Sequence, residues 1–126
     1  MQRTVHSTDG APAAIGPYSQ AVSAEGRFLF LSGQIPLKPD GTMVVGGIRE
    51  QAEQVMRNLE AVLTSAGLTF ENVVKTTILL SSMDHFAAVN DVYGSRFPEN
   101  PPARATYAAA GLPKGVDIEI EMVAVF

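Results

Sequence analysis

An apolar stripe along residues 48–66 constrains the fold of this chain most strongly. Its members are spaced three or four residues apart, which places them on one face of an α-helix: Ile48, Ala52, Val55, Met56, Leu59, Val62, Leu63 and Ala66. Gly67 follows the last apolar position, where the end of a helix favours a residue that tolerates positive φ. Glu53 lies four residues from both Arg49 and Arg57, so we expect charge pairs on the outer face of this helix. A helix of this length must bury its stripe against other parts of the chain.

Segments rich in β-branched and aromatic residues can supply that opposing surface. The predicted strands are residues 3–5, 18–24, 28–32, 73–80, 103–109 and 118–126. Glu25-Gly26 separates the second and third of these, which predicts a hairpin between them. Residues 73–80 are almost continuously apolar at both ends, which predicts a central strand that is covered on both faces.

A second helix is predicted from Met83 to about Phe97, with Ser81 or Ser82 as its cap. Asn90 interrupts the apolar side of this helix with a polar group. Residues 98–102 then form a rigid, extended connection, because prolines restrict both their own backbone and that of the preceding residue. Strands combined with two helices predict an α+β fold in which the helices cover one face of the sheet. The opposite face would then need a partner.

Composition limits the classes of protein to consider. The 126 residues suit one domain, 1–126, and only 17% of them are charged, which indicates that part of the surface contacts another subunit. The net charge of −4 without a basic stripe argues against a nucleic-acid partner. No apolar leader and no long apolar run are present, so we expect no membrane contact and a cytoplasmic location. The chain has no Cys, and His6 and His85 lack the spacing of metal ligands, so no metal site is expected, and the alternative is a zinc site built from carboxylates and single histidines.

Arg104 is the first candidate for a ligand-binding residue. It follows Pro101-Pro102-Ala103 and leads into an apolar strand, so its backbone is well ordered. The planar guanidinium can bind a carboxylate through two charge-assisted hydrogen bonds. The alternative is a structural salt bridge from Arg104 to a nearby Glu.

Two acids and a glycine are further candidates. In Ile118-Glu119-Ile120-Glu121 the isoleucines share one face of a strand and the acids share the other. Either the acids form a solvated face, or one of them orients or deprotonates a water molecule in a crevice. Ser32-Gly33 ends a predicted strand, where a ligand can approach the backbone closely. Ser32 lies in no nucleophile-elbow motif, which argues against a serine hydrolase.

Several short motifs occur together in one order along the whole chain. They are Gly16-Pro17-Tyr18-Ser19-Gln20-Ala21, Ser32-Gly33-Gln34-Ile35-Pro36, Val74-Lys75-Thr76-Thr77, Val89-Asn90-Asp91-Val92-Tyr93, Pro102-Ala103-Arg104-Ala105 and Leu112-Pro113-Lys114 to Ile118-Glu119-Ile120-Glu121. In this combination the sequence resembles the RidA/YjgF family of reactive-intermediate imine deaminases.

The resemblance implies a chorismate-mutase-like (bacillus-type) α+β fold and a homotrimer whose three sheets line a central β-barrel. It implies hydrolysis of 2-imino acids, such as 2-iminopropanoate and 2-iminobutanoate, to 2-keto acids and ammonia without a cofactor. The sites would lie in clefts between subunits. Arg104 would bind the substrate carboxylate and Glu119 would position water, while the pocket residues would be Tyr18, Ser32, Gly33, Asn90, Ala105 and Tyr107.

Many bacterial members have Ser directly after the arginine and Cys close behind it, where this chain has Ala105 and Thr106-Tyr107. The difference bears on the shape of the pocket and on the range of substrates.

Other functions are compatible with the same resemblance. A non-catalytic protein that binds small metabolites such as 2-keto acids would keep the fold without turnover. A ribonuclease or translation inhibitor is a third possibility, against which the acidic balance and the lack of a histidine pair argue. A mutase rests on fold analogy alone.

Overall fold

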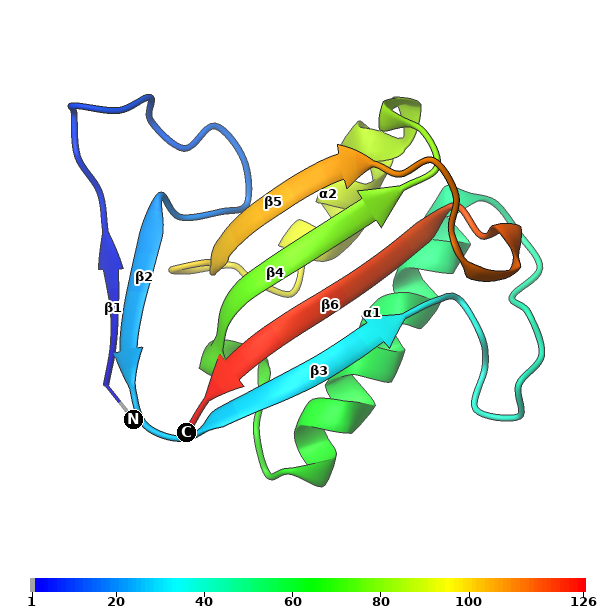
Figure 1. Ribbon diagram of the computed structural model, residues 1–126, viewed down its shortest axis with the longest axis horizontal. Coiled ribbons are helices and arrows are strands. Elements are labelled where there is room, and N and C mark those ends of the chain that lie inside the picture. The colour runs from blue at the N-terminus through cyan, green and yellow to red at the C-terminus, as the bar shows by residue number, and fades with distance from the viewer. Residues whose placement is uncertain (1) are drawn as a thin grey trace.

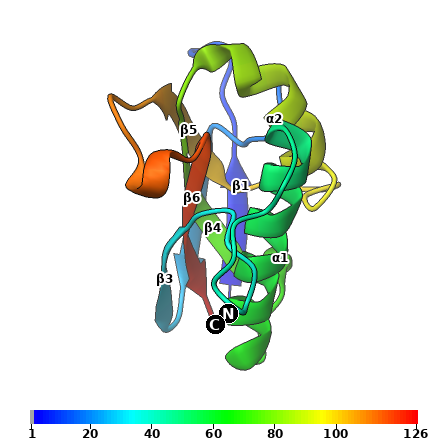
Figure 2. The same ribbon diagram turned by 90° about the vertical axis from the view of Figure 1, so that its right-hand side faces the viewer.

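The computed structural model describes residues 2–126 and contains a four-stranded mixed sheet with helices on one face (Figures 1 and 2). The sheet has the strand order β3 (Phe28–Gln34), β6 (Ile118–Val125), β4 (Val73–Leu80) and β5 (Ala103–Ala108). β6 runs antiparallel to both β3 and β4, and β5 runs parallel to β4. The prediction of an α+β fold with helices on one face of a sheet is therefore confirmed.

The remaining elements surround this sheet. The two helices on its face are α1 (Ile48–Ser65) and α2 (Phe86–Gly94). β1 (Gln2–His6) and β2 (Ala21–Glu25) form a separate two-stranded sheet beside it (Figure 1). Three single-turn 3₁₀ segments complete the described structure: η1 (Phe70–Asn72), η2 (Met83–His85) and η3 (Pro113–Gly115).

The core lies between α1 and the inward face of the sheet. The stripe of α1 is buried as predicted at Ala52, Val55, Met56, Leu59 and Leu63, whereas Val62 remains 36% exposed. The opposing sheet residues are buried too: Ile78 and Leu80 in β4, and Ile118, Ile120 and Met122 in β6. Gly67 follows the helix with a φ of 74°, as its place after the stripe predicted.

The predicted hairpin between residues 18–24 and 28–32 is wrong. β2 begins at Ala21 and pairs with β1, while β3 pairs with β6 in the other sheet. Gly26 makes the turn between the two sheets with a φ of 146°, and a Cβ atom there would collide with the backbone of Phe126. The alternation of side chains shows that a strand is present but not which strand it pairs with, because pairing depends on distant parts of the chain.

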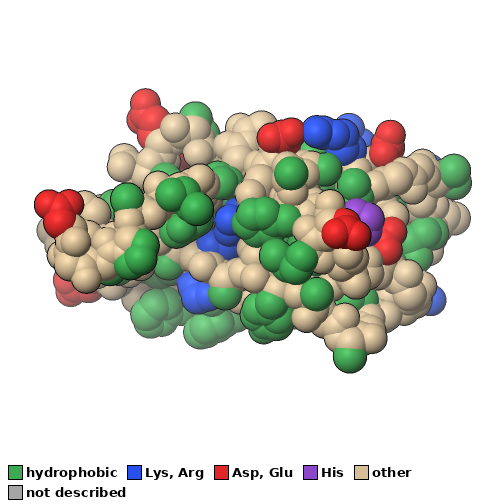
Figure 3. Space-filling model, turned by 90° about the horizontal axis from the view of Figure 1, so that it is seen from above, with side chains coloured by type: hydrophobic (Ala, Val, Ile, Leu, Met, Phe, Trp, Pro, Cys, Tyr) green, Lys and Arg blue, Asp and Glu red, His purple; other side chains and the backbone are tan. Residues whose placement is uncertain are grey.

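The prediction that residues 73–80 are covered on both faces is also wrong for a single chain. β4 is central, but its side chains alternate between a buried face and a face on which Lys75 is exposed. The uncovered face of the sheet carries large apolar side chains, with Phe28 60% exposed, Phe30 74% exposed and Tyr107 53% exposed. In Figure 3 this uncovered face lies along the lower margin, where hydrophobic side chains are visible.

The second helix is shorter than predicted, and the connection that follows it is not extended. Ser82 caps the single turn η2 by accepting a hydrogen bond from Asp84 N. α2 follows η2 and ends at Gly94. Residues 98–102 turn at Asn100, where φ is 47°, rather than running extended.

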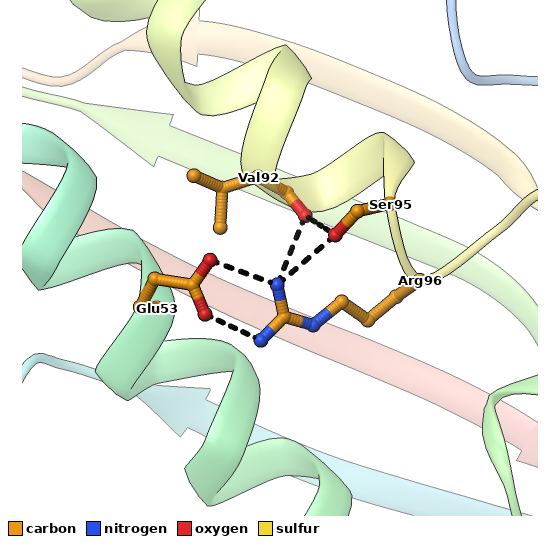
Figure 4. Close-up of polar contacts among 4 residues, drawn as sticks. All are labelled: Glu53, Val92, Ser95 and Arg96. Atoms are coloured by element: carbon orange, nitrogen blue, oxygen red, sulfur yellow. Dashed lines mark hydrogen bonds and ion pairs between the residues drawn. The ribbon is translucent and has the colours of Figure 1, made fainter.

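Glu53 of α1 pairs with a residue beyond the end of α2 and not with an arginine of its own helix. Glu53 forms a two-pronged ion pair with Arg96, at 3.1 and 2.6 Å (Figure 4). Arg49 bonds Asp91 of α2 at 2.9 Å. These pairs therefore join the two helices.

Candidate functional site

Arg104 lies on the edge strand β5 and points to the face of the sheet that carries the helices. Its register partner in β4 is Thr76, which is 1% exposed. Because neighbouring residues of paired strands share a face, both side chains point towards α2. The guanidinium therefore lies in a half-buried position between the sheet edge and α2, and not on the uncovered face.

Neutral groups surround the guanidinium. Arg104 Nη1 donates a hydrogen bond of 2.7 Å to Asn90 Oδ1 in α2. The guanidinium carbon lies 5.4 Å from the centre of the Tyr18 ring, 5.6 Å from that of Phe86 and 5.3 Å from that of Tyr93. At such distances the faces of aromatic rings attract a cation. Viewed from above, positively charged surface is visible in a hollow between hydrophobic side chains (Figure 3).

The loop before β2 brings Tyr18 to this position. Ser19 N donates to Pro102 O at 3.1 Å, and Ser19 Oγ donates to Pro101 O. The loop is thereby attached to the residues directly before Arg104. Gln20 fixes its other end through hydrogen bonds to the backbone of Thr8 and Pro12. The Gly-Pro-Tyr-Ser-Gln motif is thus the segment that places an aromatic ring against Arg104.

Arg104 has no carboxylate partner among residues 2–126. The ion pairs that the described chain forms are Arg49–Asp91 and Arg96–Glu53, and His85 Nε2 lies 3.9 Å from Asp117 Oδ1. The alternative in which Arg104 makes a structural salt bridge to a nearby Glu is therefore contradicted. Burial lowers the pKa of Arg104 from its usual value, since desolvation penalises the charged form, but an arginine remains charged at neutral pH. The site offers an oriented, partly desolvated positive charge with unused hydrogen-bond donors.

A buried hydroxyl pair lies behind this charge. Tyr93 Oη and Thr76 Oγ1 are 2.8 Å apart and both residues are buried. Burial raises the pKa of Tyr93 to about 12, so its hydroxyl is neutral at physiological pH. The ring is further held by Phe97, whose centre lies 4.8 Å away. Tyr93 is therefore a fixed wall of the Arg104 site.

Glu119 lies in a different place, on the uncovered face of β6. Its register partner is Leu79, and the alternating Ile118 and Ile120 point into the core. β3 carries an extra residue opposite this part of β6, between Leu31 and Gln34, which forms a β-bulge. At this bulge a Cβ atom on Gly33 would overlap the carboxylate of Glu119. The glycine therefore creates the space that the Glu119 side chain occupies.

The predicted site residues thus form two groups within one chain. Arg104, Asn90 and Tyr18 gather on the helix side of β5. The other group lies on or beside the uncovered face of the sheet: Ser32, Gly33, Ala105, Tyr107 and Glu119. Arg104 and Glu119 therefore lie on opposite faces of the same sheet.

Sequence reasoning missed some residues around Arg104. The sequence places Phe86, Asn90 and Tyr93 on one side of the second helix, but Phe86 and Tyr93 were not predicted as site residues. Thr106 shares the helix side of β5 with Arg104, and its hydroxyl is buried without a hydrogen-bond partner in the described structure. The alternation along β5 predicts that Arg104 and Thr106 share a face, while Ala105 and Tyr107 share the other.

The two histidines lie in separate parts of the structure. His6 Nε2 is 2.7 Å from Ser23 Oγ in the β1–β2 sheet. His85 in η2 lies 3.9 Å from Asp117. Residues 2–126 contain no cluster of three or more His, Cys, Asp or Glu side chains that could hold a metal ion. Within the same residues, no helix has both the length and the apolar character needed to cross a membrane.

Comparisons with known proteins agree over almost the whole chain. Residues 8–126 match the family model described as Endoribonuclease L-PSP. The human 2-iminobutanoate/2-iminopropanoate deaminase is 51% identical over 124 residues, which cover 98% of this chain and 90% of the human protein.

Solved structures share the fold. The crystal structure of a putative endoribonuclease from Thermotoga maritima is 50% identical with a TM-score of 0.78, and the match covers 100% of this chain and 98% of that one. RidA from an Antarctic Psychrobacter is 38% identical with a TM-score of 0.76, over 98% of this chain and 99% of that one. The fold, the ordered motifs and these matches together show that the chain belongs to the endoribonuclease L-PSP family, which is the RidA/YjgF family.

Proposed function

We propose that this protein hydrolyses 2-imino acids such as 2-iminobutanoate and 2-iminopropanoate to the 2-keto acids and ammonia. Relatives that are about half identical over nearly the whole chain bear the name of this deaminase. In this proposal Arg104 binds the substrate carboxylate and Glu119 positions the attacking water. The other pocket residues are Tyr18, Ser32, Gly33, Asn90, Ala105 and Tyr107.

The observation that carries the proposal is the unpaired charge of Arg104. Its guanidinium is oriented by an amide and three aromatic rings, and no carboxylate within residues 2–126 neutralises it. A desolvated charge without a partner costs free energy, which the carboxylate of a ligand would offset. A 2-imino acid supplies that carboxylate next to its reacting carbon.

Imine hydrolysis needs few further groups from the protein. The imine carbon is already electrophilic, so water adds to it and the nitrogen takes up a proton. The C–N bond of the resulting adduct then breaks, which releases ammonia and leaves the 2-keto acid. One carboxylate that orients the water and passes its proton on is enough for these steps, and no cofactor takes part.

We further propose that the complete site forms between chains of a homotrimer with a central barrel. Arg104 and Glu119 of one chain lie on opposite faces of the sheet, so a second chain must bring a Glu119 to an Arg104. The exposed Phe28 and Phe30, whose ring centres are 6.1 Å apart, give the uncovered face an apolar surface that another chain can cover.

RNA cleavage is the other activity that the family description suggests. The net charge of −4 is unfavourable for binding a phosphate backbone, and the two histidines of the described chain are not paired for acid–base catalysis. Imine hydrolysis suits the Arg104 site better because it needs one anion-binding group rather than a basic groove.

The deciding experiment measures the conversion of 2-iminobutanoate that a dehydratase generates in the same cuvette. We expect Arg104→Ala to abolish the rate enhancement while the variant stays folded and assembled. Arg57→Ala removes a cation from an exposed helix position and should behave like the wild type. Wild-type turnover in Arg104→Ala would contradict the assignment.

A wild-type protein that binds 2-oxobutanoate in calorimetry but does not accelerate imine hydrolysis would instead be a metabolite-binding protein of the same fold.

A further inference from the structure

We propose that Asn90 and Tyr93 are positioning residues for Arg104 that fix its guanidinium through neutral groups, so that its charge remains available to a ligand. This inference rests on the proposed role of Arg104 as the carboxylate-binding residue. It gives Asn90 a function different from direct contact with substrate, and it gives Tyr93 a function that its burial in the core alone would not suggest.

α2 presents these side chains to Arg104 together. Phe86, Asn90 and Tyr93 are four and three residues apart and therefore share one helix face. The amide oxygen of Asn90 accepts from Arg104 Nη1 at 2.7 Å, and the rings on either side of it lie within 5.6 Å of the guanidinium carbon. One face of a rigid helix thus sets both the direction and the depth of the guanidinium.

Tyr93 cannot move away from this position. It is fully buried, its hydroxyl is bonded to Thr76 Oγ1 at 2.8 Å, and Thr76 is the register partner of Arg104. Release of the ring would leave a buried hydroxyl without a partner, which is unfavourable. The hydroxyl pair therefore ties the wall of the site to the strand pair that carries Arg104.

The chemical identity of residue 90 is central to the inference. An amide oxygen orients a guanidinium but does not neutralise it, whereas a carboxylate of almost the same shape would do both. Asp91, the next residue, is an acid, but its carboxylate bonds Arg49 on α1 instead of Arg104. Among residues 2–126, the titratable groups that face the Arg104 guanidinium are the hydroxyls of Tyr18 and Tyr93, which are neutral when protonated.

Asn90→Asp tests this directly, with binding of 2-oxobutanoate measured by calorimetry between pH 4 and pH 8. We expect the affinity to fall by about tenfold or more at neutral pH, because the new carboxylate competes with the ligand for Arg104. The loss should persist over this pH range, because the neighbouring guanidinium keeps the new carboxylate ionised, and the wild type should bind throughout it. Asn100→Asp adds the same charge at an exposed position and should bind like the wild type.

Tyr93→Phe and the double variant Tyr93→Phe/Thr76→Val separate positioning from stability. The single variant leaves the Thr76 hydroxyl unpaired, so we expect a lower urea midpoint and a higher KM with a smaller change in kcat. The double variant removes that unpaired group and should regain stability. KM should remain raised, because the ring at position 93 still lacks its hydrogen bond to residue 76. A return of KM together with stability would show a purely structural role and overturn the proposal for Tyr93.

The outcomes also separate this inference from the proposed reaction. Equal binding by Asn90→Asp and the wild type at neutral pH would overturn the role of Asn90 and leave the deaminase proposal intact. Wild-type binding without turnover would remove the reaction and keep the inference. Absence of carboxylate binding by the wild type would overturn both, because Arg104 would then not serve a ligand.

Discussion

Gly33 shows how a single residue sets the position of a side chain that belongs to another strand. The carboxylate of Glu119 occupies the space where any other residue at position 33 would place its Cβ atom. The β-bulge in β3 brings the backbone of Gly33 to this point. The sequence indicated a close approach to the backbone here, since a glycine follows the end of the predicted strand. It did not indicate that the group approaching is a side chain of the same protein.

Gly33→Ala should therefore displace Glu119 and lower kcat for 2-iminobutanoate hydrolysis by about 100-fold, as small displacements of catalytic groups do. The melting temperature should change little, because the carboxyl end of Glu119 can rotate away from the added methyl group. Gly111→Ala is the matched control, since its Cβ would meet no atom within 4 Å and its φ is not positive. A normal kcat in Gly33→Ala would argue against any role for Glu119 in its present position.

At the scale of elements, the placement of α2 against α1 determines where Asn90 and Tyr93 stand. Arg96, just beyond α2, joins Glu53 of α1 through two hydrogen bonds and also donates to Val92 O and Ser95 Oγ (Figure 4). The side chain of Arg96 is 19% exposed, while both partners in the Arg49–Asp91 pair are more than half exposed. The two links between the helices therefore differ in how strongly solvent screens them.

Arg96→Ala should lower the free energy of unfolding by about 1–2 kcal/mol, because it removes a partly shielded, two-pronged ion pair. Arg49→Ala should change it by less than about 0.5 kcal/mol, as is usual for exposed pairs. Urea denaturation of both variants checks the difference. Equal losses would show that shielding does not distinguish the two pairs.

The same ion pair makes stability depend on pH. The hydrogen bonds from Arg96 hold the pKa of Glu53 below its usual value, so the stabilisation is complete above the unfolded pKa of about 4.3. It is lost as the pH falls through the lower, folded-state pKa. Arg96→Ala should therefore flatten the acid side of the stability profile, and an unchanged profile would contradict the link.

At the scale of the whole molecule, the uncovered sheet face is the feature that a single chain leaves unsatisfied. Sequence composition predicted a partner from the low fraction of charged residues, and the structure shows large apolar side chains on the sheet face that no helix covers. Two helices cover one face, and the described chain has no third layer for the other.

Phe30→Asp should convert the proposed trimer into monomers and abolish turnover, because a buried, unpaired carboxylate in an apolar interface is strongly unfavourable. Sedimentation equilibrium gives the mass, and circular dichroism shows whether the fold is kept. Val45→Asp is the control, since Val45 is 93% exposed in the loop beside α1. A trimer that survives Phe30→Asp would move the interface to another surface.

The sequence by itself determined the features that repeat with the period of a helix or a strand. The stripe of α1, the alternation of β6 and the caps at Ser82 and Gly67 follow from local backbone geometry, so they could be predicted residue by residue. The ordered motifs indicated Arg104 and Glu119 as a pair. Only the tertiary structure decided that β2 pairs with β1 and not with β3, and that Arg104 and Glu119 lie on opposite faces of the sheet. It also decided that Asn90 and three aromatic rings surround the guanidinium, because such contacts join segments far apart in the chain and carry no local signature.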